Sequence, residues 1–278
     1  MHFLYEVREM EITAYIKRLL MSHITRLTTA QLLAEPNLQL TEEQRVWMED
    51  AICRLKNNEP LQHVLGYGEF YGRKFKCDSR ALVPRPETEE LVDWIINDWA
   101  TINSRQLPIN VLDIGTGTGC IALSLAKELE GAKITAVDIS TAALSLAREN
   151  ANILEVKNVD FIEGDILNKS FNSQLSTFNL IVSNPPYVRE CEKTDMEANV
   201  LDYDPHTALF VSDEDPLIFY RAIAKFALKH LAPNGALYFE INQYLSRETC
   251  DLLVAMGYKN VELRKDINDN PRMIKATL

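Results

Sequence analysis

The chain has 278 residues, 46% hydrophobic and 25% charged, values typical of a globular protein rather than a disordered or fibrous one. Its formal charge of −11 disfavours a protein that coats nucleic acid, because such proteins carry a basic surface. The five cysteines include no C-x-x-C pair, which argues against a disulfide framework or zinc site and favours a reduced, cytoplasmic setting. The histidines lack metal-ligand spacing and no run of 18 apolar residues exists, so we expect neither a metal nor a membrane span.

Residues 1–57 predict a small helical bundle. Thr29 and Thr41 are the expected N-caps, and Gln44 follows Thr41 at the spacing of a capping box. Apolar residues recur at helical spacing, and four are expected to fill the core between the helices: Leu33, Trp47, Ile52 and Leu55.

Residues 58–86 predict a β-hairpin linker. Glycines alternate there with aromatic residues, and Pro84 and Pro86 stiffen the segment that follows. The hairpin carries a basic cluster of Arg73, Lys74, Lys76 and Arg80. This cluster fits either contact with an acidic or phosphorylated partner or a solvated hairpin face.

Residues 87–278 predict an α/β domain, in which a first helix precedes alternating strands and helices. The expected strands are 111–114, 134–137, 159–162, 178–182, 237–241, 261–263 and 273–276. The expected helices between them are 121–129, 141–153, 217–231 and 245–256. Repeated strand–helix units predict a parallel, doubly wound sheet.

A glycine-rich turn follows the first of these strands and predicts a nucleoside site. Asp138 ends the next strand, where a carboxylate can accept hydrogen bonds from both hydroxyls of a ribose. After the third strand, Asp165 is placed to meet an adenine amine and Ile166 to pack on the ring. The turn has the spacing G-x-G-x-G and consists of Gly115, Thr116, Gly117, Thr118 and Gly119. This set resembles class I S-adenosylmethionine-dependent methyltransferases.

The fourth strand ends in Asn184-Pro185-Pro186-Tyr187, which predicts a site for a planar NH₂ group. The prolines fix the backbone and remove two N–H donors, so the Pro185 carbonyl and the Asn184 side-chain oxygen are free to accept. Tyr187 offers a flat face on which an amide or a base can pack. Holding both hydrogens favours a tetrahedral nitrogen whose lone pair points at the methyl sulfonium, so catalysis needs no covalent intermediate. The tetrapeptide resembles the signature of methyltransferases that act on amino nitrogens.

The segments Glu59–Gly66, Gly68–Gly72 and Leu82–Glu89, with the tail Lys265–Met273, resemble the release factor glutamine methyltransferase (HemK) family. The resemblance implies a helical N-terminal domain that grips the partner, a hairpin linker and a Rossmann-like class I catalytic domain. It implies methylation of N5 of the glutamine in the Gly-Gly-Gln loop of release factors, with S-adenosyl-L-homocysteine as product. By position, Gly115–Gly119, Asp138 and Ile166 would line the cofactor, with Asn184 bordering both cofactor and glutamine. Arg85 and Glu87, with Pro86 and Thr88, would shape the floor of the substrate site.

Two rival functions share part of this pattern. A nucleic-acid amino-methyltransferase, acting on adenine N6 of DNA or guanine N2 of rRNA, would use the same motifs but needs phosphate contacts. The acidic balance of residues 81–278, which carry the whole net charge, counts against it, so we expect no direct nucleic-acid binding. A monomer is the default expectation, since no sequence feature indicates an oligomer. A binding module that has lost catalysis is disfavoured by the intact glycine turn and Asn184. Cys120, His63 and His206 are expected to be packing or loop residues rather than a nucleophile or bases.

Overall fold

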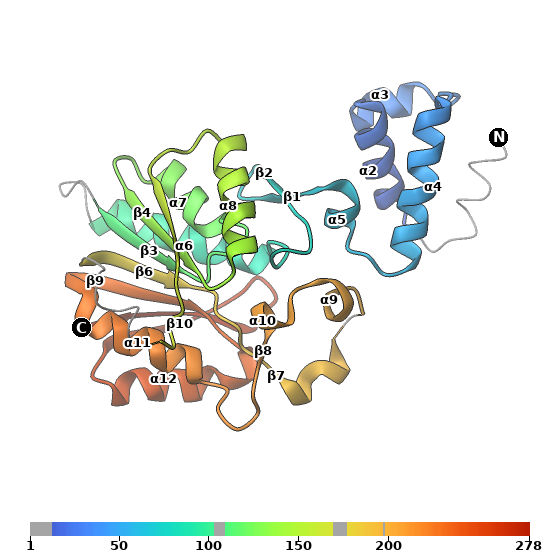
Figure 1. Cartoon of the computed structure of the whole chain (residues 1–278). Coiled ribbons are helices and arrows are strands. Elements are labelled where there is room, and N and C mark those ends of the chain that lie inside the picture. The colour runs from blue at the N-terminus through green and yellow to red at the C-terminus, as the bar shows by residue number, and fades with distance from the viewer. Residues whose placement is uncertain (1–12, 103–108, 169–176, 197) are drawn as a thin grey trace. The chain divides into compact units, whose positions relative to one another are not determined.

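The computed structural model describes residues 13–102, 109–168, 177–196 and 198–278. It divides into two compact units, Met1–Gly66 and Tyr67–Leu278, so the predicted hairpin belongs to the larger one (Figure 1). Within the described residues no helix has the length and apolar character that a bilayer span requires.

The smaller unit is helical, as predicted for residues 1–57, whereas residues 61–65 were wrongly placed in the hairpin linker and form a helix. Its helices are α2 (Ala14–Thr25), α3 (Thr29–Ala34), α4 (Glu42–Lys56) and α5 (Leu61–Leu65). The capping box of Thr41 and Gln44 at the start of α4 is confirmed. Thr29 as an N-cap was wrong: Thr28 caps α3, and its backbone N–H donates to Gln31 Oε1 at 2.9 Å. Leu33 was also wrongly expected in the core, because α3 is short and leaves this side chain 72% exposed.

The larger unit has the predicted alternation of strands and helices. Its hairpin strands are β1 (Tyr67–Phe70) and β2 (Arg73–Lys76), and a short parallel pair is formed by β7 (Val188–Arg189) and β8 (Phe210–Val211). The main-sheet strands are β3 (Asn110–Ile114), β4 (Lys133–Asp138), β5 (Val159–Glu163), β6 (Phe178–Ser183), β9 (Leu231–Glu240), β10 (Lys259–Lys265) and β11 (Pro271–Thr277). The helices are α6 (Pro86–Ile102), α7 (Cys120–Glu128), α8 (Thr141–Ile153), α9 (Ala198–Tyr203), α10 (His206–Leu209), α11 (Ile218–His230) and α12 (Ser246–Ala255), with 3₁₀ turns η2 (Glu190–Asp195) and η3 (Gln243–Leu245).

The main sheet has the order β10-β11-β9-β6-β3-β4-β5 among the described residues. The run from β9 to β5 is parallel, as predicted. The expectation of a wholly parallel sheet was wrong at one edge, where β11 runs antiparallel to both β9 and β10. Only the short segment 266–270 joins β10 to β11, and a parallel crossover needs a dozen or more residues.

Alternate residues of the central strands supply the two cores of the larger unit. Val111 on β3 packs on the side of α6, α7 and α8, whereas its neighbour Leu112 packs on the side of α11 and α12. Helices therefore cover both faces of the sheet (Figure 1). The chain runs from β3 outward to β5 and then returns to β6 on the other side of β3. This reversal creates a crevice at the carboxyl ends of β3 and β6, where sheets of this kind bind ligands.

Candidate active site

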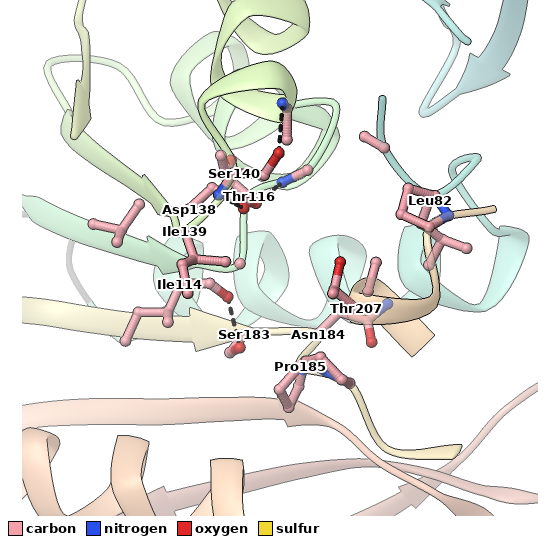
Figure 2. Close-up of a pocket in the computed structure, with 18 of the residues that line it drawn as sticks. Leu82, Ile114, Thr116, Asp138, Ile139, Ser140, Ser183, Asn184, Pro185 and Thr207 are labelled. Carbon is pink, nitrogen blue, oxygen red and sulfur yellow. Dashed lines mark hydrogen bonds between the residues drawn. The ribbon is translucent and has the colours of Figure 1, made fainter. Parts of the chain in front are cut away.

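A cavity of about 400 Å³ lies at the carboxyl ends of the parallel strands. It is lined by residues at and after the ends of β3, β4, β5 and β6, together with residues 80–85, Thr88, Pro205, Thr207, Ala208 and Phe210. Most of its walls are apolar and a few polar groups converge on it, as in sites for small molecules. Figure 2 shows Asp138, Thr116 and Ser140 gathered in one part of the cavity and Asn184 and Pro185 in another.

The glycine turn and Asp138 are joined by hydrogen bonds. The backbone N–H of Gly117 donates to one oxygen of Asp138 at 2.9 Å, and that of Ser140 donates to the other at 2.9 Å. Burial raises the pKa of Asp138, while these two N–H groups act in the opposite direction. Each oxygen of a carboxylate can accept a second hydrogen bond, so Asp138 can still receive ligand hydroxyls.

Residues on either side of Asp138 complete this part of the cavity. The Thr116 hydroxyl donates to Asp113 Oδ2 at 2.6 Å, and burial raises the pKa of that carboxyl to about 7. Asp165 lines the cavity and accepts the backbone N–H of Leu167 at 2.8 Å. Ile166 lines it too, with its side chain packed partly against the core.

Gly119 lies outside the cavity lining although it belongs to the glycine turn. Its φ of +82° is a conformation that side chains rarely adopt. A Cβ atom there would approach Leu123 Cδ1 at 3.1 Å and Ala147 Cβ at 3.2 Å. The geometry therefore gives Gly119 a packing role between α7 and α8, while its predicted contact with a cofactor stays a prediction.

The Asn184-Pro185-Pro186 turn borders the cavity beside the end of β3. Ser183 ends β6, and its hydroxyl donates to the Ile114 carbonyl at 2.6 Å, which fixes the two strand ends together (Figure 2). Asn184, Pro185 and Pro186 all line the cavity. The side-chain N–H of Asn184 donates to the Thr88 hydroxyl at 3.2 Å.

Tyr187 lies behind this turn and is not among the cavity-lining residues. Its hydroxyl donates to Glu240 Oε1 at 2.9 Å, and its carbonyl accepts from the Asn242 side chain at 3.0 Å. Burial is the main cause that raises the pKa of Tyr187, and the negative charge of Glu240 adds to it. The predicted packing of its ring on a substrate stays a prediction.

The predicted floor of the substrate site is only partly in the cavity. Arg85 and Thr88 line it, whereas Glu87 does not. Arg85 pairs with the buried Asp204 at 2.8 Å, which holds the segment before α6 against the loop before α10. Sequence motifs did not indicate Glu240 or the lining residues Ala208 and Phe210. A carboxylate inside the apolar run 236–241 was the available signal for Glu240, because unpaired charge is costly in a core.

Cys120 and His206 fit the minor roles expected of them. Cys120 lines the cavity, but burial raises the pKa of its thiol to about 12, so the thiolate required of a nucleophile is not favoured. His206 is outside the lining; its Nε2 lies 2.9 Å from the Leu201 carbonyl and its ring packs edge-on against Phe210. His63 is buried in α5 of the smaller unit.

The basic cluster of the hairpin is engaged within its own unit. Arg73 pairs with Glu128, and both Lys76 and Arg80 pair with Glu149, at 2.6 and 2.7 Å. Lys74 lies over the ring of Tyr67 at 4.2 Å. Neither a partner contact nor a solvated face was expected to involve ion pairs within the unit, and three of the four basic side chains make such pairs.

The larger unit has the fold of a class I methyltransferase. Residues 108–277 match the family model of a methyltransferase domain, and residues 7–66 match a "PrmC N-terminal domain". Two solved structures share the fold. The hMettl16 catalytic domain in complex with an RNA hairpin has a TM-score of 0.58 and 15% identity, and the match covers 74% of this chain and 76% of that chain. A methyltransferase from Pyrococcus furiosus has a TM-score of 0.52 and 18% identity, and the match covers 82% of this chain and 97% of that chain. The chain is thus an S-adenosylmethionine-dependent methyltransferase.

Curated relatives identify the family more closely. The release factor glutamine methyltransferase of Flavobacterium psychrophilum is 46% identical over 98% of this chain and 93% of its own length. The release factor glutamine methyltransferase of Bacteroides thetaiotaomicron is 48% identical over 82% of this chain and 80% of its own length. The chain belongs to the release factor glutamine methyltransferase family, and the resemblance inferred from its sequence is confirmed.

Proposed function

We propose that this chain methylates N5 of the glutamine in the Gly-Gly-Gln loop of release factors, using S-adenosyl-L-methionine and releasing S-adenosyl-L-homocysteine. The observation that carries the proposal is the position of Asn184 and Pro185 in the same cavity as Asp138 and the glycine turn. The methyl donor and the acceptor nitrogen must meet, and this cavity has a polar group suited to each at the ends of β4 and β6, the strands on either side of β3.

The residues of the cavity fit the cofactor. Asp138 retains hydrogen-bonding capacity for ribose hydroxyls, and Asp165 and Ile166 offer an acceptor and an apolar surface for adenine. The glycine turn contributes four residues to the cavity lining: Gly115, Thr116, Gly117 and Thr118. When bound, the cofactor supplies an electrophilic methyl group on a positively charged sulfur.

Asn184 and Pro185 position the acceptor nitrogen of the substrate. A side-chain amide nitrogen is a poor nucleophile because its lone pair is delocalised into the carbonyl. Two fixed acceptors, the Asn184 Oδ1 and the Pro185 carbonyl, can hold both N–H groups and turn the lone pair toward the methyl group. This is catalysis by positioning and preorganised electrostatics, and it requires no covalent intermediate on the protein.

The other parts of the chain are assigned by the same proposal. Residues 1–57 grip the release factor, residues 58–86 act as the linker that contains the β1–β2 hairpin, and residues 87–278 carry the chemistry. The enzyme acts in the cytoplasm as a monomer. Its lining residues Arg85 and Thr88 shape the floor under the glutamine, with Glu87 in the first turn of α6 behind them.

The test is methyl transfer from radiolabelled S-adenosylmethionine to purified release factor. A release factor with alanine in place of the loop glutamine is the matched control, and duplex DNA and ribosomal RNA are offered in parallel. We expect label on the unaltered factor alone. Label on nucleic acid with none on the factor would instead assign the Asn184 turn to a base amino-methyltransferase.

A further inference from the structure

The Asn184 side chain presents two unlike groups, a carbonyl oxygen that accepts and an NH₂ that donates. The proposed function requires the oxygen to face the substrate, because the glutamine NH₂ has only protons to offer. With the amide turned over, two donors would face each other. What fixes the direction of this amide therefore decides whether the site works.

A buried chain of hydrogen bonds leads from Asn184 into the sheet. Asn184 Nδ2 donates to the Thr88 hydroxyl at 3.2 Å, and Thr88 donates to Glu240 Oε2 at 2.6 Å. Thr88 lies in the first turn of α6 and Glu240 ends β9, and their exposed fractions are 2% and 1%. Thr88 lines the cavity, whereas Glu240 lies behind it.

The order of donors in this chain is fixed by the number of protons available. Both side-chain oxygens of Glu240 accept in the structure, one from Tyr187 and one from Thr88, so the single proton of the Thr88 hydroxyl is directed to Glu240. The Thr88 oxygen can then only accept from Asn184, so the amide must turn its NH₂ toward Thr88. Its oxygen is the end left for the cavity that Asn184 lines.

Glu240 is itself held in place. Tyr187 donates to its second oxygen at 2.9 Å, and the Tyr220 hydroxyl donates to its backbone carbonyl at 3.3 Å. The pKa of Glu240 is raised, mainly by burial and also by the negative charge of Glu87, while the bonds from Thr88 and Tyr187 and the positive charge of Arg272 act in the opposite direction. Both side-chain oxygens are thus committed to donors, which an acceptor-only group requires.

We propose that Thr88 and Glu240 are positioning residues that set the direction of the Asn184 amide, so that its oxygen faces the glutamine NH₂. The proposal rests on the proposed function, since it names what orients the group that this function uses. It also gives Tyr187 a role from behind the cavity, through its hydrogen bond to Glu240.

Three variants test the proposal on the full-length enzyme, with release factor as substrate. Thr88→Val keeps the shape of the side chain but removes the acceptor, and we expect kcat to fall about 10-fold, near the upper limit for a lost hydrogen bond. Thr88→Ser restores the hydroxyl and should recover most of kcat. Glu240→Gln offers Thr88 a donor, which reverses the order of donors and turns Asn184 over, so we expect a larger loss of about 10²-fold.

The controls separate positioning from general damage. Thr249→Val in α12 removes another buried threonine hydroxyl, one that donates to the Leu245 carbonyl, and should leave kcat within about 2-fold. Affinity for S-adenosylmethionine, measured by calorimetry, should change less than about 3-fold in Thr88→Val and Glu240→Gln. Circular dichroism and thermal melting report whether each variant is folded.

Defined outcomes overturn the proposal. The proposal is rejected by any of three results: wild-type kcat in Thr88→Val, no recovery of kcat in Thr88→Ser, or a loss of cofactor affinity that parallels the loss of kcat. If Glu240→Gln is folded and retains wild-type kcat, Thr88 acts without Glu240 and the proposal is rejected. If the unaltered enzyme transfers no methyl group to release factor, the proposed function itself fails, which is a different result.

Discussion

Single side chains divide the cavity into two kinds of interaction. Asp138 is an acceptor at the end of β4, suited to cofactor hydroxyls, whereas Asn184 is an acceptor at the end of β6, suited to a substrate amine. They belong to strands on either side of β3. Substitutions at the two positions should therefore affect different kinetic quantities.

Asn184→Ala should retain cofactor binding and lose turnover. One of the two acceptors for the NH₂ group disappears, and loss of a comparable preorganised partner costs about 10²- to 10³-fold in kcat. Single-turnover methyl transfer and calorimetry with S-adenosylmethionine measure the two effects. Asn152→Ala, on the exposed side of α8, is the control, and wild-type turnover in Asn184→Ala would contradict the mechanism.

Asp138→Ala should weaken the cofactor. Hydrogen bonds to a charged group contribute about 1.5–3 kcal/mol, so the dissociation constant should rise about 10- to 150-fold. Turnover at saturating cofactor should change much less. Asp160→Ala on β5 removes an exposed carboxylate and serves as control. Unchanged affinity in Asp138→Ala would mean that the ribose is held elsewhere.

At the scale of elements, the hairpin is fastened to α8 by polar contacts. Asn150 accepts the backbone N–H of Lys76 at 2.7 Å and donates to its carbonyl at 3.2 Å. Asn150 also donates to the Thr118 carbonyl at 2.9 Å, so one buried side chain joins the hairpin, α8 and the glycine turn. Glu149 adds ion pairs to Lys76 and Arg80 on the surface.

The Glu149 pairs make the stability of this attachment depend on pH. Hydrogen bonds from Arg80 and Lys76 lower the pKa of Glu149 from its ordinary 4.5 to about 2. A lowered carboxyl pKa stabilises the folded state above the unfolded pKa, and this contribution disappears as pH falls through the folded pKa. Glu149→Gln should therefore lower the denaturant midpoint of unfolding at pH 7. The gap between the midpoints of the variant and the wild type should narrow as pH falls from about 4.5 to about 2. Glu130→Gln, at an exposed position, is the control; a difference independent of pH would contradict the assignment.

The sequence predicts elements best where periodicity is strong. The helix 141–153 has the predicted bounds, and the hairpin falls where glycines and aromatic residues alternate. The antiparallel edge was missed because strand direction depends on which neighbours pair, and residue patterns within β10 and β11 do not specify it. In the site, motifs located the glycine turn and Asn184. The link from Thr88 to Glu240 joins residues 152 positions apart, which only the tertiary fold brings together.

At the scale of the whole molecule, charge bears on the choice of substrate. The chain carries −11, and three of the four basic residues of the hairpin cluster are paired with carboxylates of their own unit. Counterion release from phosphates, which drives non-specific nucleic-acid binding, needs available cations.

We therefore expect the enzyme to bind duplex DNA and ribosomal RNA weakly, with dissociation constants above about 10⁻⁴ M near physiological salt. Fluorescence anisotropy over a salt series measures this. Tighter binding that falls steeply with salt would contradict the expectation and favour the nucleic-acid alternative.

The place of β11 also affects how the chain folds during synthesis. β11 is made after every other strand of the main sheet, yet it lies between β9 and β10. Until residues 271–277 leave the ribosome, β9 has an open edge and β10 lacks the strand that joins it to the sheet. An open strand edge can pair with another chain and aggregate. The helical unit, which ends at Gly66, is thus synthesised before a sheet that closes only when β11 is added.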